Sequence, residues 1–315
     1  MPGELQPLSG ERVNSMVNVT MKEVLLSNGE TLAYREREGG ETKLLLIHGN
    51  MTSSKHWDLV YENIDSKYKV YAVDLRGFGS STYKNLVMSI KDFSDDVKLF
   101  VDALNLRDFA IAGWSTGGAI GMQFVADYPG YCNKLILLAS ASTRGYPYIG
   151  KIRDEDEPKR LSMHEELKRD LVRTIPIQTA YDTNNTELLK LIWNSVIYTH
   201  NQPETERYDE YVQDMRTQRN LAEVYYALNT FNISHHSNGL VDGNGKVDDI
   251  HVPVLVLYGE RDMVVVQEMT DELLHDLGDK AQAVKLKGCG HSALVDDLPQ
   301  LLTEMEQFLD SEVKV

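Results

Sequence analysis

One short stretch of the chain carries the residue types of an activated nucleophile. Gly113-Trp114-Ser115-Thr116-Gly117 follows an apolar run, and a helical pattern begins directly after it. A Gly-x-Ser-x-Gly motif between a strand and a helix is typical of a nucleophile elbow, a sharp turn that exposes a serine hydroxyl. The two glycines leave room for backbone segments that pass closely. The free N–H groups at the start of the helix favour negative charge beside the serine. We therefore predict that Ser115 is a nucleophile.

A nucleophilic serine needs a general base, and the base needs an acid that fixes its tautomer. Asp262 lies just after an apolar run at residues 253–258, and His291 lies in a glycine-rich loop after the next run, at residues 281–286. If both runs are parallel strands of the sheet that carries Ser115, their loops emerge at the same edge. The sequence predicts His291 as the base and Asp262 as the acid, with Glu260 as a less favoured acid.

Backbone N–H groups near the serine are expected to stabilise a developing oxyanion. One donor is Thr116, directly after the nucleophile. The other belongs to the loop that follows the apolar run at residues 43–47, and it is Asn50 or its neighbour Met51. His48, which precedes this loop, is expected to be structural.

The order of the remaining elements predicts an α/β fold with a doubly wound, mostly parallel sheet. Apolar runs of strand length alternate with helical patterns, and such alternation implies right-handed crossovers. Residues 22–29 and 31–36 are expected to form a hairpin, since an Asn-Gly turn joins them. We assign the core of the fold to residues 20–141 and 237–315, and a polar extension to residues 1–19.

Residues 142–236, called the cap here, interrupt this alternation. The cap shows helical patterns over residues 161–175, 185–197, 204–216 and 220–228, with no run typical of a buried strand. Such an insertion is expected to cover the carboxyl-terminal edge of the sheet, where open α/β sheets bind ligands. The side chains predicted to contact a ligand there are Met51, Trp114, Trp193 and Tyr198. Tyr146 and Tyr148 are further candidates for the pocket wall.

Composition excludes several classes of partner. The 315-residue chain has a formal net charge of −16, which argues against nucleic acid and anionic membrane surfaces. Its two cysteines are too few for a disulfide scaffold, and no apolar run is long enough to span a membrane. The first residues lack the pattern of a signal peptide, so we expect a cytoplasmic protein. The oligomeric state is not indicated.

Three other features do not predict a site. His235-His236 has no companion ligand at a spacing typical of a metal site. Gly77-Phe-Gly79 lacks the remaining glycine of a dinucleotide fingerprint. Cys289 is expected to be a small buried side chain. We therefore predict neither a metal nor a cofactor.

The motifs together resemble the α/β-hydrolase fold superfamily, with serine esterase, lipase and lactonase-like members that carry a helical cap. The resemblance extends over nearly the whole chain from Met21, in segments that occur in the expected order: His48–Asn50, Asp74–Ser81, Gly113–Gly118, Gly259–Asp262 and Gly290–His291. The order Ser, Asp, His is that of this superfamily. The resemblance implies acyl transfer to Ser115 and then to water, with a small-molecule ester or lactone as substrate. A carbon–carbon bond hydrolase and a non-turnover ligand receptor on the same fold are the alternatives.

Overall fold

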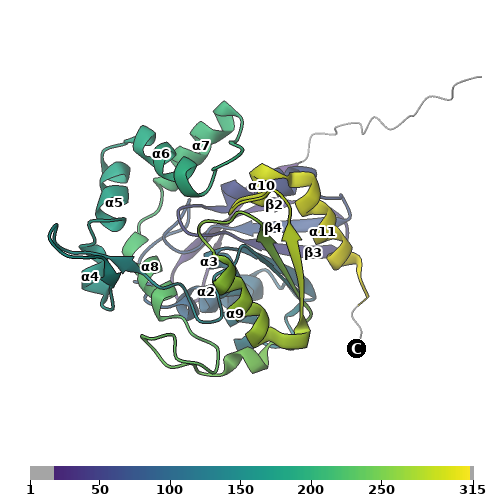
Figure 1. Ribbon diagram of the computed structural model, residues 1–315. Helices are drawn as coiled ribbons and strands as arrows, with labels where there is room; N and C mark the ends of the chain where they lie inside the picture. The colour runs from purple at the N-terminus through teal and green to yellow at the C-terminus, as the bar shows by residue number, and fades with distance from the viewer. Residues whose placement is uncertain (1–17, 313–315) are drawn as a thin grey trace, which may run out of the picture.

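A computed structural model describes residues 18–312, and an eight-stranded sheet forms its centre (Figure 1). The strand order across the sheet is β1-β2-β4-β3-β5-β6-β9-β10. The strands are β1 (Val19–Leu25), β2 (Thr31–Arg37), β3 (Thr42–Ile47), β4 (Tyr68–Val73), β5 (Phe109–Trp114), β6 (Cys132–Leu138), β9 (Val254–Gly259) and β10 (Ala281–Leu286).

The sheet is mostly parallel, as the sequence predicts. β1 and β2 form an antiparallel hairpin, and β2 also pairs antiparallel with β4, whereas every other neighbouring pair is parallel. The hairpin turn contains Gly29 with φ of +87°, a conformation that favours glycine over other residues. The carboxyl ends of β3, β5, β6, β9 and β10 therefore lie at one edge of the sheet.

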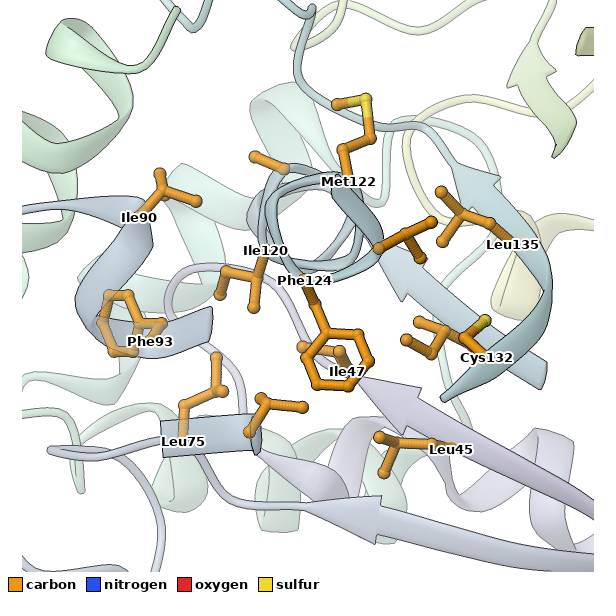
Figure 2. Packing of buried hydrophobic residues seen from close by; sticks show 14 of the residues in the cluster. Leu45, Ile47, Leu75, Ile90, Phe93, Ile120, Met122, Phe124, Cys132 and Leu135 are labelled. Carbon is orange, nitrogen blue, oxygen red and sulfur yellow. The ribbon is translucent and has the colours of Figure 1, made fainter. Parts of the chain in front are cut away.

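Helices cover both faces of the sheet because the strand side chains alternate between two buried clusters. Leu45 and Ile47 of β3 belong to the cluster on the side of α2 (Ile90–Ala103), α3 (Thr116–Asp127) and α9 (Gln267–Leu277). Leu44 and Leu46 belong to the cluster on the side of α1 (Asp58–Asn63) and α11 (Leu298–Asp310). Figure 2 shows Ile120 and Phe124 of α3 pointing toward Ile47. A short helix, α10 (Ala293–Asp296), precedes α11.

The segment between β6 and β9 is helical and lies to one side of the sheet (Figure 1). Two pairs of residues, Ile149–Gly150 (β7) and Lys159–Arg160 (β8), form a small antiparallel ladder that the sequence did not predict. The loop between them carries the acidic run 154–157, which is mostly exposed. The helices are α4 (His164–Lys168), α5 (Thr174–Asp182), α6 (Thr186–Val196), α7 (Thr205–Met215) and α8 (Leu221–Thr230).

The helical pattern over residues 161–175 does not form one helix. α4 ends at Lys168, and α5 begins only at Thr174. The break lies at the buried Asp170, whose carboxylate accepts hydrogen bonds from the backbone N–H groups of Val172, Arg173 and Thr174. A carboxylate that accepts these amides starts a new helix in the manner of an N-terminal cap. The other three predicted cap helices correspond to α6, α7 and α8 within a few residues.

None of the helices within residues 18–312 is long and apolar enough to cross a membrane. The polar extension predicted for residues 1–19 lies outside the described residues, apart from its last two.

Candidate active site

Ser115 occupies a strained turn between β5 and α3. Its backbone has φ of +56° and ψ of −115°, values that non-glycine residues rarely adopt. Hydrogen bonds hold this conformation: Ser115 N–H donates to the Leu138 carbonyl at 2.9 Å, and Gly118 N–H donates to the Ser115 carbonyl at 3.0 Å. Strain that the surrounding structure maintains is concentrated at functional sites. The geometry is that of a nucleophile elbow.

The two glycines of the motif are required by close backbone contacts. A Cβ atom at Gly113 would overlap the backbone of Gly117, and a Cβ atom at Gly117 would overlap the carbonyl oxygen of Ile47. Both obstacles are backbone atoms of packed elements, which cannot move aside as the end of a flexible side chain can. The turn therefore depends on glycine at both positions.

His291 and Asp262 form a buried pair at the same edge of the sheet. His291 Nδ1 lies 2.9 Å from Asp262 Oδ2, and the two side chains are only 4% and 3% exposed. Asp262 Oδ1 also accepts the N–H groups of Val264, at 2.8 Å, and Val265, at 3.0 Å. The alternative acid, Glu260, is exposed and accepts the Gly288 N–H instead. Asp262 is thus the carboxylate in contact with His291.

The imidazole and the serine hydroxyl face a common cavity of about 320 Å³. Ser115 and His291 both line it, and Trp114 fixes the loop of His291 by donating its Nε1–H to the His291 carbonyl at 3.0 Å. Within residues 18–312 no hydrogen bond joins Ser115 Oγ to His291. Such bonds are often long in ligand-free enzymes and shorten when substrate binds.

Backbone N–H groups suited to an oxyanion lie beside Ser115. A Cβ atom built on Gly49 would be 3.1 Å from Ser115 Cβ and 3.8 Å from its Oγ, so the loop after β3 contacts the nucleophile. In the described part of the chain, no protein acceptor is bound to the N–H of Thr116, Asn50 or Met51. All three residues line the cavity. Thr116 and one of the two loop residues can therefore donate to a negatively charged oxygen.

Three of the four residues predicted to contact a ligand line the cavity: Met51, Trp114 and Trp193. Tyr198 does not. Its ring lies 5.2 Å from that of Trp193, and it packs between Trp193 and Tyr208. Tyr198 therefore supports the wall from behind. Of the two further candidates, Tyr146 lines the cavity, whereas Tyr148 is buried with Leu161 and Leu167.

Sequence reasoning missed one cavity residue of distinct chemistry, Arg173. Among the lining residues within residues 18–312, it is the only arginine or lysine. Its position inside the predicted helix 161–175 gave no sign of this, because a single arginine on a helical pattern is ordinarily exposed. The break at Asp170 places it at the start of α5, facing the cavity.

His48 and Cys289 are buried residues of the loops beside the site. His48 is fully buried, its Nε2 accepts the Leu75 N–H at 3.0 Å, and its Nδ1 donates to the Gly49 carbonyl at 2.7 Å. Burial lowers the pKa of His48 to about 4, so the neutral ring holds the loop near physiological pH. Burial also raises the pKa of the Cys289 thiol to about 11, as for an unreactive cysteine.

The histidine pair at residues 235 and 236 has companions that its sequence spacing did not indicate. His236 lies near His275 and Asp276, and one potential ligand atom of each lies within 4.8 Å of the others. However, the carboxylate of Asp276 already accepts hydrogen bonds from Thr143 and Arg144. A metal ion there would have to compete with a guanidinium, so the cluster does not fit a metal site well.

The chain is similar in sequence to known hydrolases. The family model described as alpha/beta hydrolase fold matches residues 43–298. The AB hydrolase superfamily protein YisY of Bacillus subtilis is 24% identical over 85% of this chain and 91% of its own length. A pimeloyl-[acyl-carrier protein] methyl ester esterase of Aliivibrio fischeri is 25% identical over 89% of this chain and 98% of its own length.

The fold is also that of solved structures. An esterase of Exiguobacterium antarcticum superposes with a TM-score of 0.70 at 14% identity, over 93% of this chain and 100% of its own. Because the family model matches most of the chain, and because the strand order and the serine turn fit it, the chain belongs to the alpha/beta hydrolase fold family.

Proposed function

We propose that this protein is a serine hydrolase that cleaves a carboxylic ester through an acyl-enzyme intermediate. The observation that carries the proposal is that a strained Ser115 and His291 line one cavity, and that His291 is paired with the buried carboxylate of Asp262. A serine on an elbow, a histidine and a hydrogen-bonded carboxylate are the parts that acyl transfer requires.

In the first half-reaction, His291 Nε2 takes the proton of Ser115 Oγ as the hydroxyl attacks the ester carbonyl. The carbonyl oxygen becomes negative and accepts hydrogen bonds from Thr116 and from Asn50 or Met51. Collapse of the tetrahedral intermediate breaks the bond to the alcohol, which receives the proton from His291. The acyl group remains on Ser115.

In the second half-reaction, His291 takes a proton from water, and the hydroxide formed attacks the acyl-enzyme. The carboxylic acid leaves, and Ser115 regains its proton from His291. Throughout, the carboxylate of Asp262 accepts a hydrogen bond from Nδ1–H of His291 and stabilises the imidazolium that forms twice in the cycle. The two backbone N–H donors of Val264 and Val265 keep its carboxylate in place.

The cap, residues 142–236, acts in this proposal as a lid on a core of residues 20–141 and 237–315. Side chains from α5, α6 and α8 form one side of the cavity, and the loops that carry Asn50, Ser115 and His291 form the other. The pimeloyl methyl ester esterase relative is named for an ester substrate, which favours an open ester over a lactone. Met51, Trp114 and Trp193 are the proposed substrate contacts.

A fluorophosphonate probe and a panel of p-nitrophenyl esters, monoacylglycerols and lactones test the proposal. The wild-type protein is expected to be labelled at Ser115 and to turn over at least one class of ester. Ser115→Ala should abolish labelling and lower hydrolysis by about 10³-fold or more. Ser195, whose hydroxyl donates to the Ile192 carbonyl, also lines the cavity, so Ser195→Ala is the matched labelling control and should still be labelled.

The outcomes are distinct. Ester turnover retained by Ser115→Ala would contradict the mechanism. Rapid labelling of Ser115 without sustained turnover would indicate a ligand receptor instead of an enzyme. Turnover confined to lactones would retain the chemistry and change the substrate.

A further inference from the structure

The cavity contains one permanently charged side chain in otherwise neutral surroundings. No aspartate or glutamate of the described residues lines it, and aromatic and aliphatic side chains form most of the wall. Arg173 is the exception, a half-buried arginine that the proposed ester hydrolysis does not use. Apolar pockets with a few polar groups are usual for small ligands, and the polar groups determine the orientation and the specificity.

Arg173 is fixed in position by its neighbours. Its backbone N–H donates to Asp170 Oδ2 at 2.7 Å, and its guanidinium lies 5.1 Å from the centre of the Tyr148 ring. Tyr148 is itself fully buried and donates its hydroxyl to Asp170. A guanidinium held over an aromatic ring, on a backbone fixed by a hydrogen bond, retains little conformational freedom. Binding of a ligand group to it therefore costs little side-chain entropy.

No carboxylate in the described part of the chain pairs with this charge. Among the ion pairs of residues 18–312, none involves Arg173. The nearest acid in sequence, Asp170, is occupied by the Tyr148 hydroxyl and by backbone N–H groups. By contrast, Arg207 of α7 pairs with Asp58 and Glu62. In the described part of the chain Arg173 is thus a cation without an acidic partner, on a protein with a net charge of −16.

The guanidinium and the groups proposed to react share one cavity. Arg173 lines this cavity together with Ser115 and His291. A substrate whose ester carbonyl contacts Ser115 can therefore extend toward Arg173 inside the same cavity.

We propose that Arg173 binds a free carboxylate of the substrate, so that the preferred substrate is an anionic ester, such as the half-ester of a dicarboxylic acid. The proposal rests on the ester hydrolysis proposed above. A planar guanidinium accommodates a carboxylate through two parallel N–H···O bonds, and mostly apolar surroundings strengthen such a charge-assisted contact. A neutral ester of the same size would leave Arg173 unpaired.

The test compares monomethyl adipate with the methyl ester of adipic acid monoamide, in which a neutral carboxamide replaces the carboxylate. Methanol release is measured for both. The wild-type enzyme is expected to prefer the carboxylate in kcat/KM by roughly 10-fold to 100-fold, as for a hydrogen-bonded charged group. Arg173→Gln should remove this preference, because it should lower hydrolysis of the carboxylate ester much more than that of the carboxamide ester.

Arg169→Gln is the matched control. Arg169 is exposed four residues earlier, does not line the cavity, and loses the same charge on substitution. It should keep the wild-type preference. A preference shared by Arg173→Gln and wild type, or no preference in wild type, would overturn the proposal. An equal loss of both activities in Arg173→Gln would point to a purely structural role.

Calorimetric titration with adipate and adipamide makes the result independent of turnover. Wild-type protein should bind adipate more tightly than adipamide, and Arg173→Lys should retain part of the difference that Arg173→Gln loses. Equal affinities in the wild type refute the carboxylate site even if esters are hydrolysed. A clear adipate preference in a protein that cleaves no ester would instead refute the proposed hydrolysis.

Discussion

Replacing Asp262 with asparagine tests the proposed mechanism without removing the shape of the site. In the wild type, Oδ1 accepts the N–H groups of Val264 and Val265, and Oδ2 lies 2.9 Å from His291 Nδ1. Asparagine has only one side-chain oxygen. The two backbone donors require that oxygen at the Oδ1 position, so the NH₂ group takes the place of Oδ2.

This NH₂ group donates to His291 Nδ1, which must then be unprotonated. The proton of the neutral imidazole moves to Nε2, where it faces Ser115, and His291 can no longer accept the serine proton. The wrong tautomer is expected to lower kcat by about 10⁴-fold. That loss corresponds to roughly 5 kcal/mol of transition-state stabilisation.

Steady-state hydrolysis of an aryl ester measures the effect, and thermal unfolding shows whether the fold is retained. Since the amide keeps both backbone hydrogen bonds, the free energy of unfolding should change by less than about 1 kcal/mol. Glu260→Gln is the matched control, because the exposed Glu260 contacts the Gly288 N–H and not His291. A loss below about tenfold in Asp262→Asn, or a larger loss in Glu260→Gln, would refute the assignment.

Two further predictions concern residues that maintain the loops around the site. Gly117→Ala places a methyl group against the carbonyl oxygen of Ile47, so it should destabilise the fold by about 1–3 kcal/mol or more, measured by urea unfolding. The pKa of buried His48 is lowered from its ordinary 6.5 to about 4, so the unfolded chain binds a proton there first as the pH falls. The free energy of unfolding therefore falls by about 3 kcal/mol as the pH is lowered from about 6.5 to about 4. His48→Gln should remove this contribution to the pH dependence of stability. A variant with the pH dependence of wild type would contradict this assignment.

The sheet could be predicted from the sequence because its signals are local. Buried parallel strands are short apolar runs, and the Asn28-Gly29 turn specifies the hairpin. Once the strands are parallel, topology alone brings their carboxyl ends together. For that reason the sequence alone predicts that the loops of Ser115, Asp262 and His291 lie at one edge of the sheet.

The cap could be predicted as helical, but not in its side-chain positions. A helical pattern gives the face of a helix, whereas the orientation of that helix depends on contacts distant in sequence. Tyr198 illustrates this, since only the packing against Trp193 and Tyr208 places it behind the wall. The approach of His236 to His275 and Asp276 likewise has no signal in their spacing.

The break at Asp170 shows why the substrate-selecting residue was the hardest to predict. A buried carboxylate that caps α5 is a tertiary feature, because the hydroxyl of Tyr148, which is distant from Asp170 in sequence, donates a hydrogen bond to the same carboxylate. The same carboxylate both interrupts the helix and uses its hydrogen-bonding capacity on backbone N–H groups. Arg173 follows this break at the start of α5 and lines the cavity, and the carboxylate nearest to it in sequence is engaged by other groups. One buried aspartate thus produces the geometry and the unpaired charge on which substrate selection is proposed to depend.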